Sequence, residues 1–285
     1  MRPRMMRAAP ERRWELRDIG LERVDRAAVA GDWFAFKLAA TASFIETGSD
    51  LYAANLRTFF GGDAPVERWL RCSWEPEELR HGAALRAYVE RVWPVFDWER
   101  RFHSFLEDYS RSCTVADLEA TRALELAARC IVEMGTSALY RSLHGYAREP
   151  VLKRLAALIY ADEVRHYKMF FGHFARYERF EGRSRLRVAR TLVNRLLATR
   201  SEDGRCAYRY VWDVAPNPQH LPFEASYAAF ADDLTQMLRR HAPAAMLTRM
   251  ILKPLALPSS IVDAATRFSG PLYGLWLGAA RSQAR

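Results

Sequence analysis

The chain has 285 residues, 50% of them hydrophobic, and its 43 Lys and Arg residues against 34 Asp and Glu give a formal net charge of +9. This length and composition suffice for one sizeable hydrophobic core, so we expect a single domain over residues 1–285. No uninterrupted apolar stretch reaches the roughly 18 residues that a membrane-spanning helix needs, and the scattered basic residues accompany no recognised nucleic-acid motif. These features argue against a membrane span and against a nucleic-acid partner.

Helical periodicities dominate the sequence and low-complexity stretches are missing, which predicts an all-α fold. The four cysteines show no Cys-x-x-Cys spacing, so we expect free thiols in a reducing compartment and a cytoplasmic location. Residues 1–13 hold five arginines but lack the serines and the apolar run of a targeting segment, which favours a basic tail.

The first expected element is a helix over residues 11–30. A long helix should follow, with Asp32 as its N-cap, and should run to Phe60, where Gly61 and Gly62 end it.

Glu46 lies in the middle of this long helix, on a face of small side chains that leave room for a cluster of ligands. Asp50, one turn later, is the alternative ligand from the same helix. Gly48 between them would cost about 1 kcal/mol relative to Ala. That cost indicates a local bulge or a close contact beside the ligand.

The next helix should open at Asp63 and stop at Pro94, with a kink at Pro76. The linking segment 95–111 carries several aromatic residues, which we expect to serve packing.

A third long helix is expected to begin at Thr114. Gly145 and Pro150 mark the turn into a fourth helix, which should run to about Tyr177. The apolar stretch 271–280 is expected to cap the helices, with a partner interface or a membrane contact as alternatives.

Two segments share one pattern: residues 77–81 read Glu-Glu-Leu-Arg-His and residues 162–166 read Asp-Glu-Val-Arg-His. A Glu and a His three positions apart project from one helical face, so both can bind one metal ion. The faces that carry the two motifs are otherwise apolar and contain no Lys or Arg. Because a carboxylate in an apolar interior is costly without a cation, a metal is the expected counter-charge.

A single glutamate precedes each motif at nearly the same distance. Glu46 lies 32 residues before Glu78, and Glu133 lies 30 residues before Glu163. This spacing places each glutamate level with its motif on an antiparallel neighbouring helix. Four carboxylates and two neutral imidazoles would balance the charge of two divalent ions.

The predicted architecture is therefore a four-helix bundle over residues 32–180 with a carboxylate-bridged dinuclear metal site, extra N-terminal helices and a C-terminal helical extension over residues 181–285. One Glu from each of two helices and Glu-x-x-His from each of the other two resembles the ligand set of ferritin-like di-iron or di-manganese carboxylate proteins. Oxygen and imidazole ligands suit iron, with manganese as the alternative.

Residues 74–82, Trp-Glu-Pro-Glu-Glu-Leu-Arg-His-Gly, resemble a signature of soluble acyl-(acyl carrier protein) desaturases. Residues 161–166, Ala-Asp-Glu-Val-Arg-His, resemble the second motif of that family. The resemblance covers residues 43–177 and implies that Thr136 corresponds to the family's hydroxyl residue one turn after the third-helix glutamate. It also implies six iron ligands, which are Glu46, Glu78, His81, Glu133, Glu163 and His166.

The resemblance implies an oxygen-dependent di-iron oxidase that desaturates a fatty acyl chain on an acyl carrier protein. Electrons would come from a ferredoxin or another reductase, and the family implies a homodimer. The segment 46–52 shares little with the family's first-helix pattern beyond its Glu and a Tyr, so the length of the substrate and the position of oxidation stay open. The hypothesis also expects an elongated apolar pocket beside the cluster.

Two alternative functions remain at this point. One is another ferritin-like di-iron oxygenase, such as an N-oxygenase or hydroxylase of specialised metabolism, with a short or polar pocket. The other is a helical bundle that binds metal without turnover.

Four further residues of the motifs are candidates for supporting the ligands without binding the metal. Asp162 and Glu77 are placed to orient the imidazoles, and Arg80 and Arg165 to pair with acids between helices. For Thr136, a role in proton relay or in holding an oxygen intermediate stands beside a hydrogen bond to its own helix.

A run of arginines follows the predicted bundle and offers a basic patch for the acidic carrier protein. A solvated helical face is the alternative interpretation. The residues are Arg183, Arg185, Arg187, Arg190 and Arg195.

Overall fold

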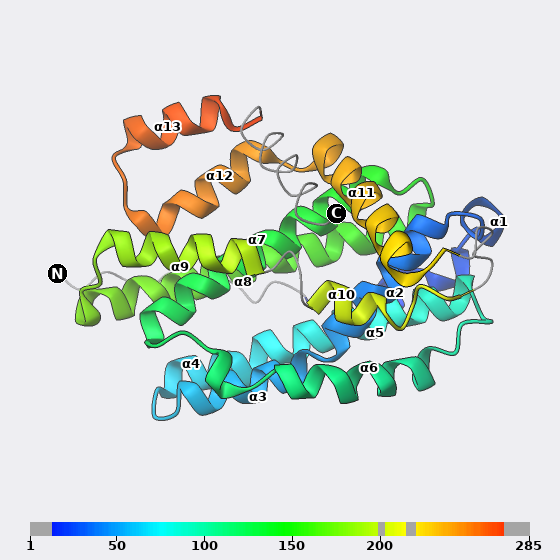
Figure 1. The fold of residues 1–285 in the computed structure, drawn as a ribbon, viewed down its shortest axis with the longest axis horizontal. Coiled ribbons are helices and arrows are strands. Elements are labelled where there is room, and N and C mark those ends of the chain that lie inside the picture. The colour runs from blue at the N-terminus through cyan, green and yellow to red at the C-terminus, as the bar shows by residue number, and fades with distance from the viewer. Residues whose placement is uncertain (1–12, 199–202, 215–220, 271–285) are drawn as a thin grey trace.

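The computed structural model describes residues 13–198, 203–214 and 221–270, and the regular secondary structure of these ranges is entirely helical, as predicted (Figure 1). The α-helices are α1 (Arg26–Val29), α2 (Trp33–Thr47), α3 (Ser49–Phe59), α4 (Ala64–Trp69), α5 (Glu75–Val92), α6 (Trp98–Ser112), α7 (Arg122–Tyr146), α8 (Pro150–Glu181), α9 (Arg185–Ala198), α10 (Asp203–Tyr208), α11 (Phe223–His241), α12 (Ala244–Leu252) and α13 (Ser259–Arg267). Shorter turns are the 3₁₀ turns η1 (Leu16–Asp18), η2 (Leu21–Arg23), η4 (Val115–Asp117) and η5 (Lys253–Leu255), and the π-helical turn η3 (Leu70–Trp74).

Four long helices carry the six predicted ligands, and they pair two by two. α2 packs along α5, α7 packs along α8, and α5 also contacts α8. Helices α9, α11 and α12 pack against α7, and Figure 1 shows α12 and α13 on the opposite side of α7 and α8 from α3 and α6. The helices that form the site therefore lie in the interior of the fold.

Acidic side chains begin several helices, and two of them, Asp32 and Asp63, were predicted from the sequence. The carboxylate of Asp32 accepts a hydrogen bond from the backbone N–H of Ala35 at 2.9 Å, and that of Asp63 accepts one from Val66. Glu149 does the same for the first turn of α8. These bonds satisfy backbone donors that have no partner within the helix.

The long helix expected from Asp32 to Phe60 is interrupted at Gly48, which separates α2 from α3. A Cβ atom at Gly48 would lie 3.4 Å from a ring carbon of Phe105 in α6. The close contact predicted beside the ligand is therefore confirmed. Pro76, where a kink was expected, lies in the first turn of α5, and directly before α5 is η3, a π-helical turn of a kind often found at functional sites.

Two predictions about the N-terminal half are wrong. The expected helix over residues 11–30 is replaced, in its described part, by η1, η2 and the short α1, because Gly20 adopts a left-handed conformation with φ of 82°. The segment 95–111 contains the helix α6 instead of a simple linker, although its aromatic residues do pack into the core.

The predicted start of the third long helix is also wrong. Thr114 caps the 3₁₀ turn η4, where the side chain of Asp117 accepts a hydrogen bond from its backbone N–H. α7 begins only at Arg122, after Thr121 as N-cap. At its other end, α8 extends to Glu181, slightly beyond the predicted end.

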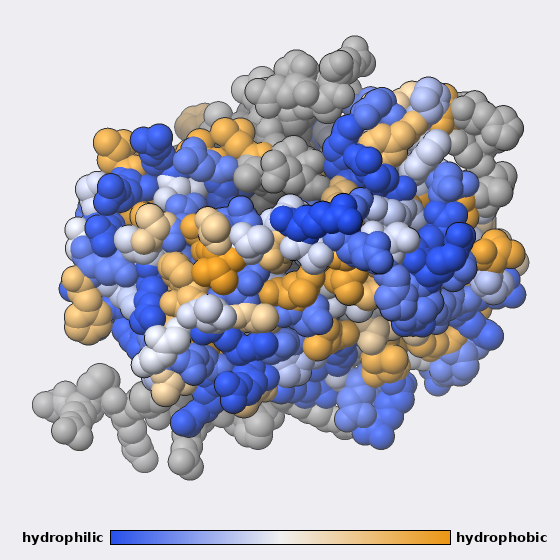
Figure 2. All heavy atoms as spheres, turned by 60° about the horizontal axis from the view of Figure 1, so that its bottom comes forward, coloured by the Kyte–Doolittle hydropathy of each residue, from blue (hydrophilic) through white to orange (hydrophobic). Residues whose placement is uncertain are grey.

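On the face shown in Figure 2, hydrophobic residues lie in small groups among hydrophilic ones. Within the described residues, no helix is both long and apolar enough to cross a membrane. Cys72, Cys113, Cys130 and Cys206 are free thiols, as expected. The stretch 271–280 and the basic tail up to residue 12 lie outside the described residues.

Candidate metal centre

The structure brings all six predicted ligands together in the interior. They form two overlapping groups, and within each group one ligand atom from every residue lies within 4.8 Å of the others. The first group is Glu46, Glu78, His81 and Glu163, and the second is Glu78, Glu133, Glu163 and His166. All six side chains are buried.

Glu78 and Glu163 belong to both groups, whereas the other four residues belong to one group each. A carboxylate that is shared by two groups can place one oxygen on each of two metal ions. The arrangement therefore has two candidate bridging carboxylates, one from α5 and one from α8.

Each imidazole directs its Nδ1 atom at the carboxylates. His81 Nδ1 lies 3.2 Å from Glu163 Oε1, and His166 Nδ1 lies 2.9 Å from Glu78 Oε1. Nδ1 is therefore the atom that each histidine offers to a metal.

The opposite nitrogen of each imidazole contacts an acid of the other motif. His81 Nε2 lies 3.0 Å from Asp162 Oδ2, and His166 Nε2 lies 2.9 Å from Glu77 Oε2. These two residues, Asp162 and Glu77, are called the outer acids below, and both were predicted from their position in the motifs. An Nε2–H that donates to a carboxylate fixes the ring orientation and leaves Nδ1 as the ligand atom.

Arg165 joins the two outer acids, because its guanidinium donates to Glu77 Oε2 at 2.8 Å and to Asp162 Oδ1 at 2.7 Å. Arg80 donates to Asp162 Oδ2 at 2.9 Å. The predicted pairing of both motif arginines with acids on other helices is thus seen in the structure.

The N-terminal segment that covers these acids was not predicted from the sequence. The indole N–H of Trp14 donates to Asp162 at 2.9 Å, and its ring stacks parallel to His81 with centroids 6.0 Å apart. Arg13 forms an ion pair with Glu77 at 3.0 Å. No local sequence motif predicts these contacts, because they depend on where the N-terminal segment packs against the helices.

Four atoms at the centre of the cluster face one another closely without forming a hydrogen bond of regular geometry. They are Glu78 Oε1, Glu163 Oε1, His81 Nδ1 and His166 Nδ1. Buried polar atoms without hydrogen bonds of regular geometry are costly, and these four converge on one another from different helices. A metal ion coordinated by these atoms would satisfy them, so the residues present fit a metal centre.

The pKa values of the carboxyl groups in the cluster reflect how strongly its charges interact. Burial, together with the neighbouring carboxylate of Glu78, raises the pKa of Glu46 to about 7. Burial, again with Glu78, also raises the pKa of Glu163. For Glu78, burial alone would raise the pKa, but the imidazoles of His166 and His81 outweigh it and hold the pKa well below its usual range. The carboxylates therefore compete for positive charge, which a metal would supply.

Two hydroxyl groups contact the inner carboxylates. Thr136 Oγ1 lies 2.5 Å from Glu163 Oε2 and 3.1 Å from the backbone oxygen of Glu133. Both interpretations of Thr136 therefore have a contact in the structure, one to the cluster and one to its own helix. Tyr140 donates from its buried hydroxyl to Glu46.

Arg129 was also missed. Its buried guanidinium lies 3.5 Å from Glu133 Oε1, one turn away on α7. The two motif faces that contain no Lys or Arg belong to α5 and α8, whereas Arg129 lies on α7. A step of four residues back from Glu133 would have found it.

The two groups can now be named by these contacts. The tyrosine half-site consists of Glu46 and His81, with Tyr140 beside Glu46. The arginine half-site consists of Glu133 and His166, with Arg129 beside Glu133.

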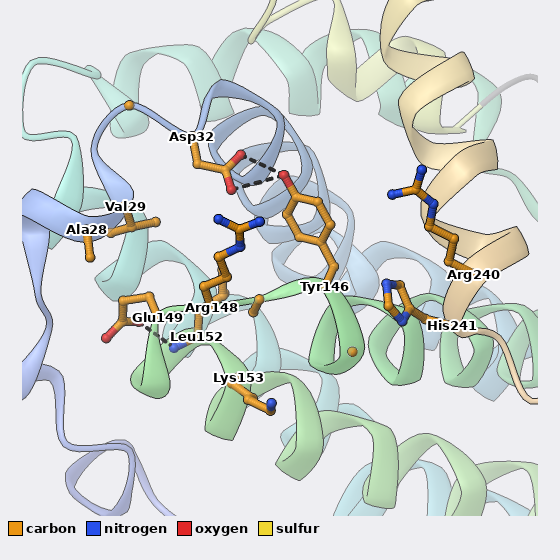
Figure 3. Close-up of a pocket in the computed structure, with 13 residues that line it drawn as sticks. Ala28, Val29, Asp32, Tyr146, Arg148, Glu149, Leu152, Lys153, Arg240 and His241 are labelled. Atoms are coloured by element: carbon orange, nitrogen blue, oxygen red, sulfur yellow. Dashed lines mark hydrogen bonds between the residues drawn. The ribbon is translucent and has the colours of Figure 1, made fainter.

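Asp50, the alternative ligand, is exposed and belongs to neither group. A cavity of about 840 Å³ lies at the turn between α7 and α8, where Figure 3 shows Tyr146, Arg148, Lys153 and Arg240. No ligand of the cluster lines this cavity. It is therefore not the elongated apolar pocket expected beside the cluster, and that pocket stays a prediction.

Among known proteins, no family model matches the chain, and no curated sequence is similar to it. The identification of a function therefore depends on the cluster of buried acids and histidines itself.

Proposed function

We propose that this protein is an oxygen-dependent di-iron oxidase with a ferritin-like bundle, which removes hydrogen from a fatty acyl chain carried by an acyl carrier protein. The two overlapping groups of buried ligands carry the proposal. Four carboxylates and two imidazoles supply ligands and charge for two divalent ions, and iron suits this mixture of oxygen and nitrogen donors. Bound iron would supply the reduction of dioxygen and the oxidising power that side chains lack.

The chain's own residues would prepare this centre. Asp162 and Glu77 hold the imidazoles so that Nδ1 faces inward. Thr136, 2.5 Å from a candidate bridging carboxylate, is placed to donate or return a proton at Glu163 Oε2. Trp14 covers the outer side of the His81–Asp162 pair.

The proposal that the substrate is bound to an acyl carrier protein is supported by the positive charge on the surface of α9. Arg185, Arg187 and Arg190 are exposed on α9, and an acidic carrier would be attracted to them. Arg183 and Arg195 contribute less, because they already face Glu181 and Glu125. Electrons would come from a separate ferredoxin or reductase.

The decisive experiment measures metal content, the optical change when the ferrous protein meets dioxygen, and oxygen uptake with acyl-carrier substrates. We expect two irons per chain in the wild type. Glu163→Ala and His166→Ala should lose iron and oxygen uptake, while His103→Ala, at an exposed position outside the cluster, should keep both.

Full metal loading of the Glu163→Ala and His166→Ala proteins would refute the ligand assignment. Two bound irons without oxygen uptake on any acyl substrate would refute the desaturase-like activity while leaving the metal centre intact.

A further inference from the structure

The two half-sites differ in the group that contacts their terminal carboxylate. In the tyrosine half-site, Glu46 accepts a hydrogen bond from a neutral phenol. In the arginine half-site, Glu133 faces a guanidinium at 3.5 Å. One half-site therefore contains a positive charge that the other lacks.

The guanidinium of Arg129 is held in place by aromatic rings. It lies 4.3 Å from the ring centroid of Tyr52 and 5.6 Å from that of Trp74, and the side chain is only 8% exposed. Contacts of this kind favour a cation over the ring face. An arginine stays protonated in proteins, so this charge remains beside Glu133.

Glu125 lies one turn before Arg129, but its carboxylate is bound by other groups. It accepts hydrogen bonds from Tyr52 and from the backbone of Glu119, both at 2.9 Å, and lies 3.9 Å from Arg195. Within the described part of the chain, the ion-pair partner of Arg129 is Glu133. The positive charge therefore acts mainly on the arginine half-site.

We propose that the two half-sites bind divalent metal with unequal affinity, that the tyrosine half-site fills first, and that Arg129 weakens binding in the arginine half-site. This inference rests on the proposed dinuclear centre. A dication bound by Glu133 would be repelled by a guanidinium on the same carboxylate, and at the effective dielectric constant of a protein this repulsion corresponds to about tenfold or more in affinity.

The order of filling is tested with manganese(II) and electron paramagnetic resonance, which distinguishes a single ion from a coupled pair. With one equivalent, the wild type should show mostly uncoupled ions. Because two cations repel each other in any such centre, two binding steps alone do not identify the half-site. Glu133→Ala should keep the tight step, whereas Glu46→Ala should lose it.

The role of Arg129 is tested by Arg129→Met, which removes the charge and retains much of the volume. The second dissociation constant should fall about tenfold or more, while the first changes little. Arg129→Lys keeps the charge and should resemble the wild type. Arg195→Met is the matched control, because it removes an arginine charge that lies near Glu125 and not beside Glu133.

Several results would overturn the inference. Two ions bound with equal affinity by the wild type, a tight step lost in Glu133→Ala and kept in Glu46→Ala, or an unchanged second step in folded Arg129→Met would each do so and leave the metal centre standing. Absence of any binding to the wild type would instead overturn the metal centre itself.

Discussion

The two helix pairs that supply the ligands differ in the continuity of their backbone. α7 and α8 run without interruption for 25 and 32 residues. In the other pair, a break at Gly48 follows Glu46 closely, and the π-helical turn η3 ends just before α5. Both pairs nevertheless present a glutamate and the same Glu-x-x-His pattern to one cluster. Regular and irregular helices can therefore deliver equivalent ligands, and the irregularities reflect local packing such as that of α6 on Gly48.

Removal of a shared ligand from either pair should have the largest effect. Glu78→Ala, in the interrupted pair, should abolish binding of both metal ions, as Glu163→Ala should in the continuous pair, because each carboxylate belongs to both groups. Metal content after gel filtration would measure this. Asp50→Ala, which alters the exposed alternative ligand, should bind metal normally. Retention of one tightly bound ion by either shared-ligand variant would contradict bridging.

The outer acids should show a smaller and nearly equal effect across the two pairs. Asp162→Asn weakens the support of His81 on the interrupted pair, and Glu77→Gln weakens that of His166 on the continuous pair. Each should lower metal affinity about 10–100-fold, as measured by calorimetric titration. Wild-type affinity in both folded variants would show that the imidazoles need no such support.

Glycine substitutions should separate the pairs in stability. A Cβ at Gly82 in α5 would lie 2.6 Å from the backbone nitrogen of Thr47, so Gly82→Ala forces α2 and α5 apart. We expect a loss of about 1–3 kcal/mol in the free energy of unfolding. At Gly135 in α7 nothing lies within 4 Å, and Gly135→Ala should gain up to about 1 kcal/mol from helix propensity. Urea unfolding of the two variants would measure this contrast, and equal effects would contradict it.

The smallest effect concerns the link between the pairs at Asp63. This residue caps α4 and accepts hydrogen bonds from Arg176 and Tyr177 of α8. Burial would raise its pKa, but the hydrogen bonds from Tyr177 and Arg176 outweigh burial and lower the pKa below the ordinary value of 3.8. A lowered pKa contributes stability above pH 3.8 that is lost as the pH falls through the folded value.

Asp63→Asn keeps a capping oxygen and removes the charge, so it should cost about 0.5 kcal/mol at pH 7. The difference between variant and wild type should shrink when unfolding is measured below pH 3.8. A difference that is the same at both pH values would show that the charge of Asp63 is irrelevant.

The ligands could be predicted from the sequence because metal binding needs few residue types at fixed helical spacing. Asp162 and Glu77 could be predicted for the same reason, because their position beside each Glu-x-x-His determines where they point. Arg129 could not be predicted in this way, because a single arginine beside an apolar stripe resembles any partly buried helical residue. The covering role of Trp14 could not be predicted either, since that contact joins residues 148 positions apart.

Helix boundaries likewise could be predicted only where the local sequence determines them. Thr114 and Thr121 are both capping residues, and only the capping box with Asp117 reveals that the first serves a 3₁₀ turn. The helix α6 was within reach, because Trp98, Phe102 and Phe105 recur at helical spacing after Asp97 as N-cap.

Each imidazole contacts an acid of the other motif, and this arrangement has a consequence for the order in which the molecule folds. His81 and Asp162 are 81 residues apart in sequence, and His166 and Glu77 are 89 apart. Contacts that close such long loops carry an entropic cost and form slowly compared with helix hairpins. The α7–α8 hairpin can form from local contacts alone, whereas the interlocked acids and imidazoles require both halves of the chain. Rapid-mixing experiments should therefore find that metal capture lags behind the gain of helical signal.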